Sequence, residues 1–141
     1  MLKKMLKRLK KDEKGFTLIE LLAVIVILAV IAVIAVPLIG NIINNTRDDA
    51  DLATARQLHD AARLYVTGEL GGDYAAVATN GVSFNDMSPE YIPANSVIPS
   101  TKDPLTNAIV RFDANGSVQS VSLDGDTDAE FNYNAAAILG D

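Results

Sequence analysis

The sequence contains no cysteine and only one histidine, His59. Without thiolates the chain cannot build zinc–thiolate or iron–sulfur sites, and it cannot form the disulfides that often stabilise small exported domains. A single histidine leaves almost no residues for nucleophilic catalysis of the Ser–His or Cys–His type. The composition therefore argues against an enzyme.

Basic residues are scarce outside the N-terminus. Residues 1–15 hold seven of the twelve lysines and arginines, and the remaining residues carry five basic against sixteen acidic side chains, a net charge of −11. Binding to nucleic acid without sequence preference needs clustered basic side chains that neutralise phosphates. The acidic remainder therefore disfavours direct nucleic-acid binding, including the role of a membrane-anchored DNA receptor.

One long apolar stretch is present. Residues 21–39 are uncharged and almost wholly aliphatic, and Phe16, Leu18 and Ile19 extend the stretch at its start. At about 1.5 Å per helical residue this stretch can cross a hydrocarbon layer of ~30 Å. The basic segment before it predicts a single membrane span with the N-terminus in the cytoplasm and the C-terminal part exported.

Three interpretations compete for residues 1–40. A cleaved secretory signal has a shorter apolar core and a small-residue A-x-A site, which does not occur at the end of this run. A plain membrane anchor fits the length but leaves Glu20 unexplained, because a carboxylate within a spanning helix is unfavourable. Glu20 could also belong to a capping box with Thr17, which would start the helix.

The third interpretation depends on the junction KGFTLIELL, residues 14–22, with a basic leader before it and an aliphatic run and Pro37 after it. Over residues 14–37 the sequence resembles the type IV pilin family, which includes the pseudopilins of type II secretion and competence systems. The resemblance implies that a membrane prepilin peptidase cuts between Gly15 and Phe16 and methylates the new amine of Phe16. It also implies that Glu20 pairs with this amine, in the same subunit or in a neighbouring one.

Such a pair has a physical purpose. An unpaired carboxylate or ammonium inside a core of packed aliphatic helices is strongly disfavoured. A subunit added in the wrong register would leave both the Phe16 amine and the Glu20 carboxylate unpaired. We therefore expect the pair to fix register during assembly.

The periodicity beyond the apolar run predicts that the helix continues. We expect residues 16–40 to form a transmembrane or filament-core half-helix, after a leader peptide of residues 1–15, and residues 41–72 to form an amphipathic half-helix. Pro37 removes an amide donor and predicts a kink or loosening, and the resemblance implies that this segment unwinds during assembly. Six apolar residues recur at spacings of three or four in the second half: Leu52, Ala55, Leu58, Ala62, Tyr65 and Val66. Gly68 and the pair Gly71–Gly72 are expected to end the helix.

The rest of the chain predicts a small sheet. Residues 73–107 contain four prolines and are expected to form a connecting loop with short elements. In residues 108–141, Asn115-Gly116 between the apolar segments 108–112 and 118–123 predicts a hairpin, and residues 131–139 predict a last strand. We therefore expect an α+β pilin fold with three or four antiparallel strands packed on the amphipathic half-helix.

Acidic residues alternate along one loop of the C-terminal region. Such spacing can converge oxygen ligands on calcium, and the candidate ligands are Asp124, Asp126, Asp128 and Glu130. The loop fails the EF-hand pattern, because alanine occupies the glycine position and the position of the bidentate acid. A calcium site and a solvated acidic turn both stay open, and no other cofactor is expected. His59 is expected to be packed or solvated rather than functional.

The predicted function is that of a structural pilin, a subunit that polymerises into an extracellular type IV pilus for adhesion or motility. The alternative is a pseudopilin of a type II secretion or competence DNA-uptake system. The resemblance implies as partners other copies of the chain, the prepilin peptidase, and the assembly platform protein with its ATPase. It implies the cytoplasmic membrane as the location before assembly and the cell surface afterwards. The missing cysteines leave out the C-terminal disulfide loop of many Gram-negative pilins and favour a Gram-positive-like protein.

Overall fold

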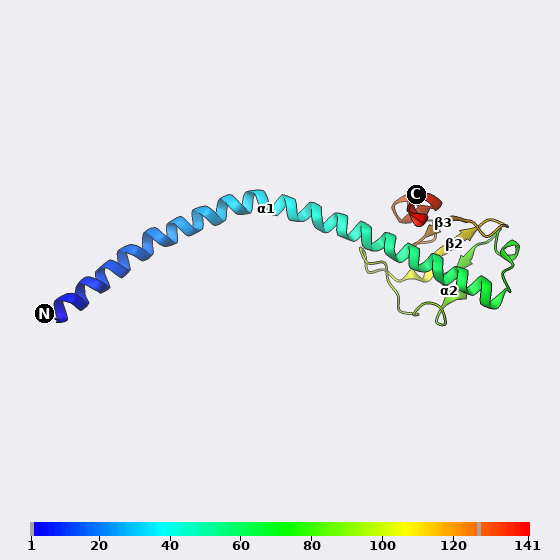
Figure 1. Cartoon of the computed structure of the whole chain (residues 1–141), viewed down its shortest axis with the longest axis horizontal. Coiled ribbons are helices and arrows are strands. Elements are labelled where there is room, and N and C mark those ends of the chain that lie inside the picture. Colours follow the sequence, from blue (N-terminus) through cyan, green and yellow to red (C-terminus); the bar gives the residue numbers. More distant parts are fainter. Residues whose placement is uncertain (1, 127) are drawn as a thin grey trace. The chain divides into compact units, whose positions relative to one another are not determined.

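The computed structural model describes the backbone of residues 2–126 and 128–141 and the side chains of residues 17–126 and 128–141. The chain divides into two compact units, residues 1–44 and residues 45–141. The helix α1 (Leu2–Glu69) accounts for the first unit and contributes its C-terminal turns to the second (Figure 1). Pro37 lies inside α1, and the helix is assigned continuously through it.

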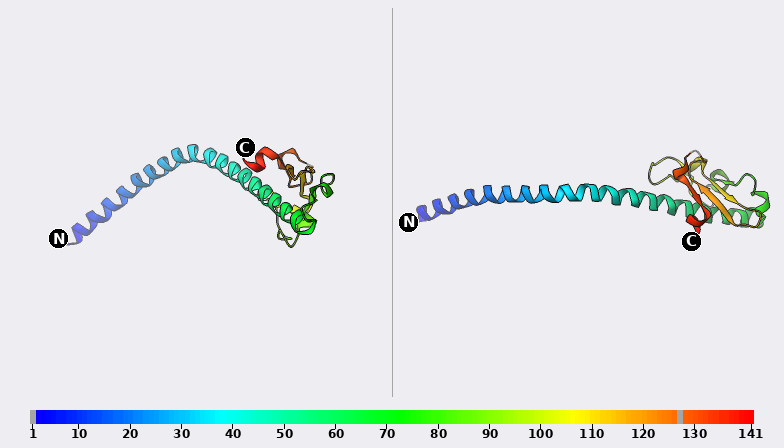
Figure 2. Two further views of the ribbon diagram at one scale, coloured as in Figure 1. Left: turned by 45° about the vertical axis from the view of Figure 1, so that its right-hand side comes forward. Right: turned by 90° about the horizontal axis from the view of Figure 1, so that it is seen from above.

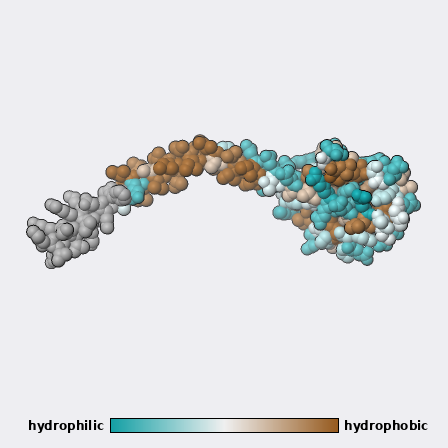
Figure 3. Space-filling model, in the orientation of Figure 1, coloured by the Kyte–Doolittle hydropathy of each residue, from teal (hydrophilic) through white to brown (hydrophobic). Residues whose placement is uncertain are grey.

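The described part of the first unit is a helix with no apolar cover. Its large apolar side chains between residues 18 and 43 are 46–77% exposed, and they form a continuous hydrophobic surface in Figure 3. Among the residues whose side chains are described, one helix, Thr17–Glu69, is long and apolar enough to cross a membrane. Apolar surface of this extent on an isolated helix indicates a segment that lipid or other protein must cover.

The second unit combines the end of α1 with a four-stranded antiparallel sheet in the order β1-β2-β3-β4. Its strands are β1 (Val82–Ser83), β2 (Ile109–Phe112), β3 (Val118–Ser122) and β4 (Asn132–Asn134). Two short helices, α2 (Phe84–Met87) and α3 (Ala135–Leu139), follow β1 and β4. Three 3-10 turns complete it, at Tyr74–Ala76, Leu105–Asn107 and Ala129–Phe131. The predicted α+β fold is therefore confirmed, and Figure 2 shows the sheet beside the last turns of α1 in both views.

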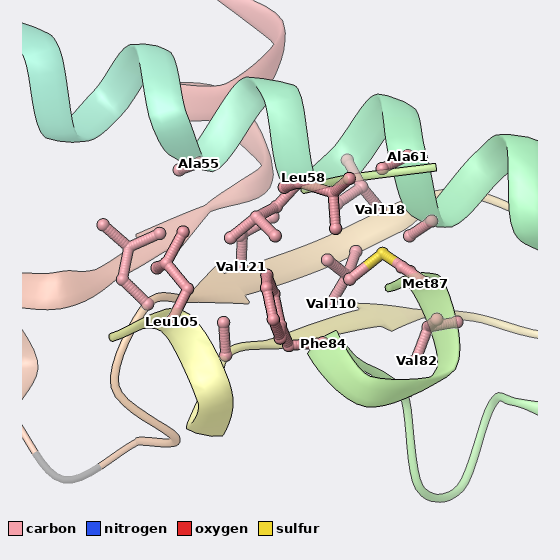
Figure 4. Close-up of a cluster of buried hydrophobic side chains, with 14 of the residues drawn as sticks. Ala55, Leu58, Ala61, Val82, Phe84, Met87, Leu105, Val110, Val118 and Val121 are labelled. Carbon is pink, nitrogen blue, oxygen red and sulfur yellow. The ribbon is translucent and has the colours of Figure 1, made fainter. Parts of the chain in front are cut away.

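The core of this unit lies between one face of α1 and the sheet. Ala55, Leu58, Ala62 and Val66 are fully buried on the helix side, and Val110 and Val121 face them from the sheet (Figure 4). Three core positions of the helix are alanines, Ala55, Ala61 and Ala62. Because cores are close-packed, these small side chains allow the sheet to lie close to the helix. The predicted amphipathic face is thus confirmed, with Leu52 and Tyr65 packed at its edge.

Two long-range polar contacts hold peripheral segments on α1. The buried carboxylate of Asp51 accepts a hydrogen bond from the backbone N–H of Ser100, 3.0 Å away. The guanidinium of Arg56 donates to the carbonyls of Ala137 and Ile138 at 3.0 and 3.1 Å. Cations at the C-terminal end of a helix offset its unpaired carbonyls. These contacts anchor the loop around Ser100 and the helix α3 without a disulfide.

The hairpin predicted at Asn115-Gly116 is present between β2 and β3. Gly116 has φ +88°, a conformation that favours glycine, and an added Cβ there would lie 2.9 Å from the ring of Tyr74. The carboxylate of Asp113 accepts hydrogen bonds from the backbone N–H groups of Asn115 and Ser117, both at 2.9 Å. The turn is therefore defined by the aspartate before it as well as by the Asn-Gly pair.

The predicted last strand over residues 131–139 is wrong in its second half. Only Asn132–Asn134 forms a strand, and Ala135–Leu139 forms the helix α3. Asn134 caps α3, since its side chain accepts from the N–H of Ala137 at 2.9 Å, and Gly140 ends it in the left-handed conformation. Three successive alanines favour helix over strand, so capping and local propensity override the apolar pattern.

Helix α1 ends three residues before residue 72, the predicted end of the amphipathic half-helix. Gly68 lies inside the helix, which ends at Glu69, and the chain reverses at Gly71 and Gly72, both with positive φ. The amide of Gly72 donates to the carbonyl of Val66 at 2.9 Å. Gly68 serves packing instead, because the hydroxyl of Tyr91 lies 2.7 Å from where a Cβ would be.

The only histidine is a core residue of the second unit. His59 is 7% exposed, and its ring centroid lies 5.8 Å from that of Phe112. Its Nδ1 lies 3.3 Å from the carboxylate of Asp60. Burial lowers the pKa of His59, and Arg63 acts in the same direction, whereas Asp60 opposes it.

The lowered pKa of His59 predicts a pH-dependent stability. The unfolded chain, with an ordinary histidine pKa of about 6.5, binds the proton more readily than the folded chain does. The contribution of neutral His59 is therefore fully present above pH ~6.5 and is lost as the pH falls through that value towards the folded pKa. The slope is at most about 1.4 kcal/mol per pH unit.

Thermal unfolding of the detergent-solubilised chain between pH 7.5 and 5 measures this effect. His59→Gln should flatten the curve in this range, because ordinary carboxylates titrate near pH 4. An unchanged slope in the variant would mean that other groups cause the pH dependence.

Candidate functional site

The predicted cleavage site lies at the edge of what the structure describes. Gly15 and Phe16 lie in the part of α1 of which only the backbone is described, so the prediction of cutting and methylation there stays a prediction. In the uncut chain the nitrogen of Phe16 is a peptide amide. A charge pair between Phe16 and Glu20 therefore requires cleavage first.

Glu20 is the one charged residue between Thr17 and Thr46. It lies on an exposed part of α1, with Leu18 and Ile19 before it and Leu21 and Leu22 after it, which are 59–74% exposed. Once such a helix is covered by lipid or by other helices, the carboxylate needs a cationic partner at the same depth. Among the described residues, no ion pair involves Glu20.

The capping-box hypothesis for Thr17 and Glu20 is wrong for the uncut chain. Helix α1 begins at Leu2, so Thr17 lies within it and does not start it. A cut between Gly15 and Phe16 would place Thr17 at the new helix N-terminus, where a hydroxyl can accept from free backbone amides. For the cut chain the capping hypothesis therefore remains a prediction.

Pro37 and Gly40 lie near the C-terminal end of the apolar run. Both are inside α1, and an added Cβ at Gly40 would meet nothing within 4 Å. Proline has no N–H to continue the helix ladder and glycine lowers helix propensity. The two residues together lower the helical stability of this part of α1.

The acidic loop does not gather its carboxylates on one point. Asp126 pairs with Arg111 and also accepts from Asn132 Nδ2 at 3.2 Å. Asp124 accepts from the hydroxyl of Ser122 at 3.1 Å, and Asp128 accepts from the N–H of Glu130 at 3.1 Å. No group of three or more acidic or histidine side chains among the residues described is placed to hold a metal ion. The calcium site stays a prediction without a geometric counterpart in the described loop.

A second acidic cluster was not predicted from the sequence. A hollow of about 380 Å³ is lined by Asp48, Asp49 and Asp51 from α1, together with Glu130 and Tyr133. Burial raises the pKa of Tyr133 to about 12, and the neighbouring carboxylates of Asp51, Asp48 and Glu130 add to this. The run Asp48-Asp49-x-Asp51 is the signal in the sequence, but its partners lie some eighty residues away along the chain.

Comparison with known families identifies the N-terminal segment. Residues 10–36 match the family model described as the prokaryotic N-terminal methylation motif. The match covers Gly15, Phe16 and Glu20 but stops before Pro37. The chain matches no curated protein and no solved structure.

The matched segment is the class III signal of type IV prepilins, and it includes most of the apolar run of α1. The second unit places a four-stranded antiparallel sheet on the amphipathic part of that helix. The chain therefore carries the N-terminal methylation signal of type IV prepilins, a class that includes the prepilins of pseudopilins, on a long apolar helix, and its second unit has a pilin-type α+β fold.

Proposed function

We propose that the chain is the structural subunit of a type IV pilus, cut between Gly15 and Phe16, methylated at Phe16, and polymerised into an extracellular filament for adhesion or motility. The observation that carries the proposal is the uncovered apolar part of α1, most of which lies within the match to the methylation motif. Two environments can cover such a helix in turn. Lipid covers it before assembly, and the helices of other copies cover it in the filament.

The acidic second unit fits the outside of such a filament. Residues 16–141 carry a net charge of −11, and charge of one sign keeps exported subunits soluble and disfavours contact between them. Association would then depend on the apolar helices. Glu20 would select the register, because its carboxylate and the methylated amine of Phe16 are both unfavourable when buried alone.

The processing step makes a direct prediction. Protein sheared from the surface of cells that express the chain should begin at methylated Phe16, with residues 1–15 absent. Mass spectrometry of the intact protein and of its N-terminal peptide measures this. The matched control is Gly15→Val, in which the added side chain blocks close approach of a protease to the backbone; this variant should accumulate uncut in the membrane. A wild-type protein with residues 1–15 still attached would refute the proposal.

A pseudopilin shares the same processing, so a different experiment separates the two roles. Electron microscopy of sheared wild-type cells should show long surface fibres that contain this chain. The pseudopilin alternative would be favoured if the acidic loop bound calcium, but the carboxylates of Asp124, Asp126 and Asp128 already accept hydrogen bonds from protein donors. Fibres absent from cells that cut and methylate the chain normally would favour the pseudopilin.

A further inference from the structure

The sequence contains two Asn-Gly pairs, Asn80-Gly81 and Asn115-Gly116. In such a pair the backbone nitrogen of the glycine can attack the side-chain carbonyl carbon of the asparagine, because glycine has no Cβ to hinder the approach. The bond from that carbon to the side-chain nitrogen breaks, ammonia leaves, and a succinimide ring forms. Water then opens the ring at either carbonyl and gives aspartate or isoaspartate. The reaction needs no enzyme and no reactant other than water.

The fold engages the nucleophilic nitrogen of both pairs. The N–H of Gly81 donates to the carbonyl of Val77 at 2.8 Å, and the N–H of Gly116 donates to the carbonyl of Asp113 at 3.1 Å. Attack requires this nitrogen to lose its proton and to meet the asparagine side chain in an aligned geometry, so each hydrogen bond must open first. The rate at each pair therefore depends on how readily its hydrogen bond opens.

Gly81 lies against the sheet. It directly precedes β1, and an added Cβ there would lie 2.8 Å from both the side chain of Ile109 and the backbone oxygen of Val110 on β2. Freeing the N–H of Gly81 thus disturbs the contact between β1 and β2. Openings that break contacts within a sheet cost more free energy than openings of an exposed turn.

Asn115 lies at the exposed tip of the hairpin between β2 and β3, and Asp113 closes this tip. The carboxylate of Asp113 accepts hydrogen bonds from the N–H groups of Asn115 and Ser117, both at 2.9 Å. Its backbone N–H also donates to the carbonyl of Ser117 at 2.9 Å. The two bonds to the carboxylate hold the backbone on both sides of the Gly116 nitrogen, so this one side chain restrains the nucleophile.

We propose that Asn115 is a site of spontaneous deamidation and that the carboxylate of Asp113 restrains the reaction. Conversion to isoaspartate lengthens the backbone within the turn and places a second carboxylate close to that of Asp113. Both changes weaken the hydrogen bonds that Asp113 accepts, since like charges repel and the donors are displaced. A chain converted at Asn115 therefore loses the closed tip. The reaction takes place within the second unit and requires no assembly.

The wild-type chain gives the first test. The detergent-solubilised full chain is incubated in mildly alkaline buffer, with and without concentrated urea, and is then digested. Liquid chromatography with mass spectrometry measures aspartate and isoaspartate at residues 80 and 115 separately. Folding should slow conversion of Asn115 at least roughly tenfold relative to urea, and it should slow Asn80 more. Equal rates of Asn115 conversion in buffer and in urea, or weaker slowing at Asn80, would overturn the proposal.

Asp113→Ala should raise conversion at Asn115 roughly tenfold, because two side-chain hydrogen bonds are lost, and should leave Asn80 within about twofold. Asp113→Asn is the matched control, since its amide oxygen can still accept from both N–H groups, and it should stay within about twofold of wild type. Leu58→Ala empties a fully buried core site on α1 and should change conversion at Asn115 less than about twofold. An equal rise at both asparagines in Asp113→Ala, or an equal rise at Asn115 in Leu58→Ala, would mean that general unfolding causes the reaction.

Hydrogen exchange of the wild-type chain decides the matter if Asp113→Ala does not fold. Exchange of the Gly116 amide requires the same opening of its hydrogen bond to Asp113. The factor by which folding slows this exchange should match, within about threefold, the factor by which it slows deamidation of Asn115. A mismatch in either direction would contradict the role of the Gly116 N–H.

Discussion

Cells that express Glu20→Ala should cut and methylate the chain normally and yet form almost no filaments. The substitution leaves residues 14–19 intact, so the peptidase still has its junction. The new amine of Phe16, however, would have no carboxylate to meet inside the apolar core. Removing one partner of a buried ion pair costs about 3–5 kcal/mol, which corresponds to at least a hundredfold loss of incorporation.

Electron microscopy of sheared fibres measures assembly, and mass spectrometry of the membrane fraction measures processing. Glu69→Ala is the matched control, since it removes an exposed carboxylate from the same helix outside the apolar part. It should leave both readings unchanged. Normal fibres in Glu20→Ala would show that the carboxylate does not set register.

Phe112→Ala should destabilise the second unit by about 3–5 kcal/mol, the usual cost of emptying a fully buried aromatic site. Phe112 is 0% exposed, and its ring lies 5.2 Å from that of Tyr74 in an edge-on arrangement. It also contacts His59 on α1. The cavity would therefore open between the hairpin and the helix, beside the rings of Tyr74 and His59.

Thermal unfolding of the detergent-solubilised chain, followed by circular dichroism, measures this loss. Phe131→Ala removes the same atoms from a partly buried site and should cost clearly less. Equal destabilisation by the two substitutions would contradict the assignment of Phe112 to the centre of the core.

The helix and the hairpin could be predicted because their signals are local. The spacing of Leu58, Ala62 and Val66 specifies a helix face, and Asn115-Gly116 specifies a tight turn, without reference to the rest of the chain. The last strand was harder, because FNYNAAAIL contains both a β-favouring half and an alanine-rich half. The side chain of Asn134, which caps α3, decides between them, and asparagine occurs in turns, caps and strands alike.

The candidate cleavage site could be proposed from the sequence for a different reason. Gly15, Phe16 and Glu20 lie within one short motif, which the family match covers, and their roles stay predictions. The hollow lined by Asp48 and Tyr133 depends on residues far apart in the chain, and the ion pair between Arg111 and Asp126 could not be read from alternating acids. Spacing in the sequence suggested converging carboxylates, whereas the fold directs those of Asp124, Asp126 and Asp128 to different donors.

The short outer strands of the sheet limit pairing between the sheets of neighbouring subunits when the local protein concentration is high. The edges are β1 with two residues and β4 with three, so each presents few free backbone groups to another chain. In the proposed pilus, subunits would gather in the membrane before assembly, and long free edges would put them at risk of pairing through their sheets into amyloid-like aggregates. Short edge strands would therefore leave association to the apolar helices and keep the subunits available for ordered growth.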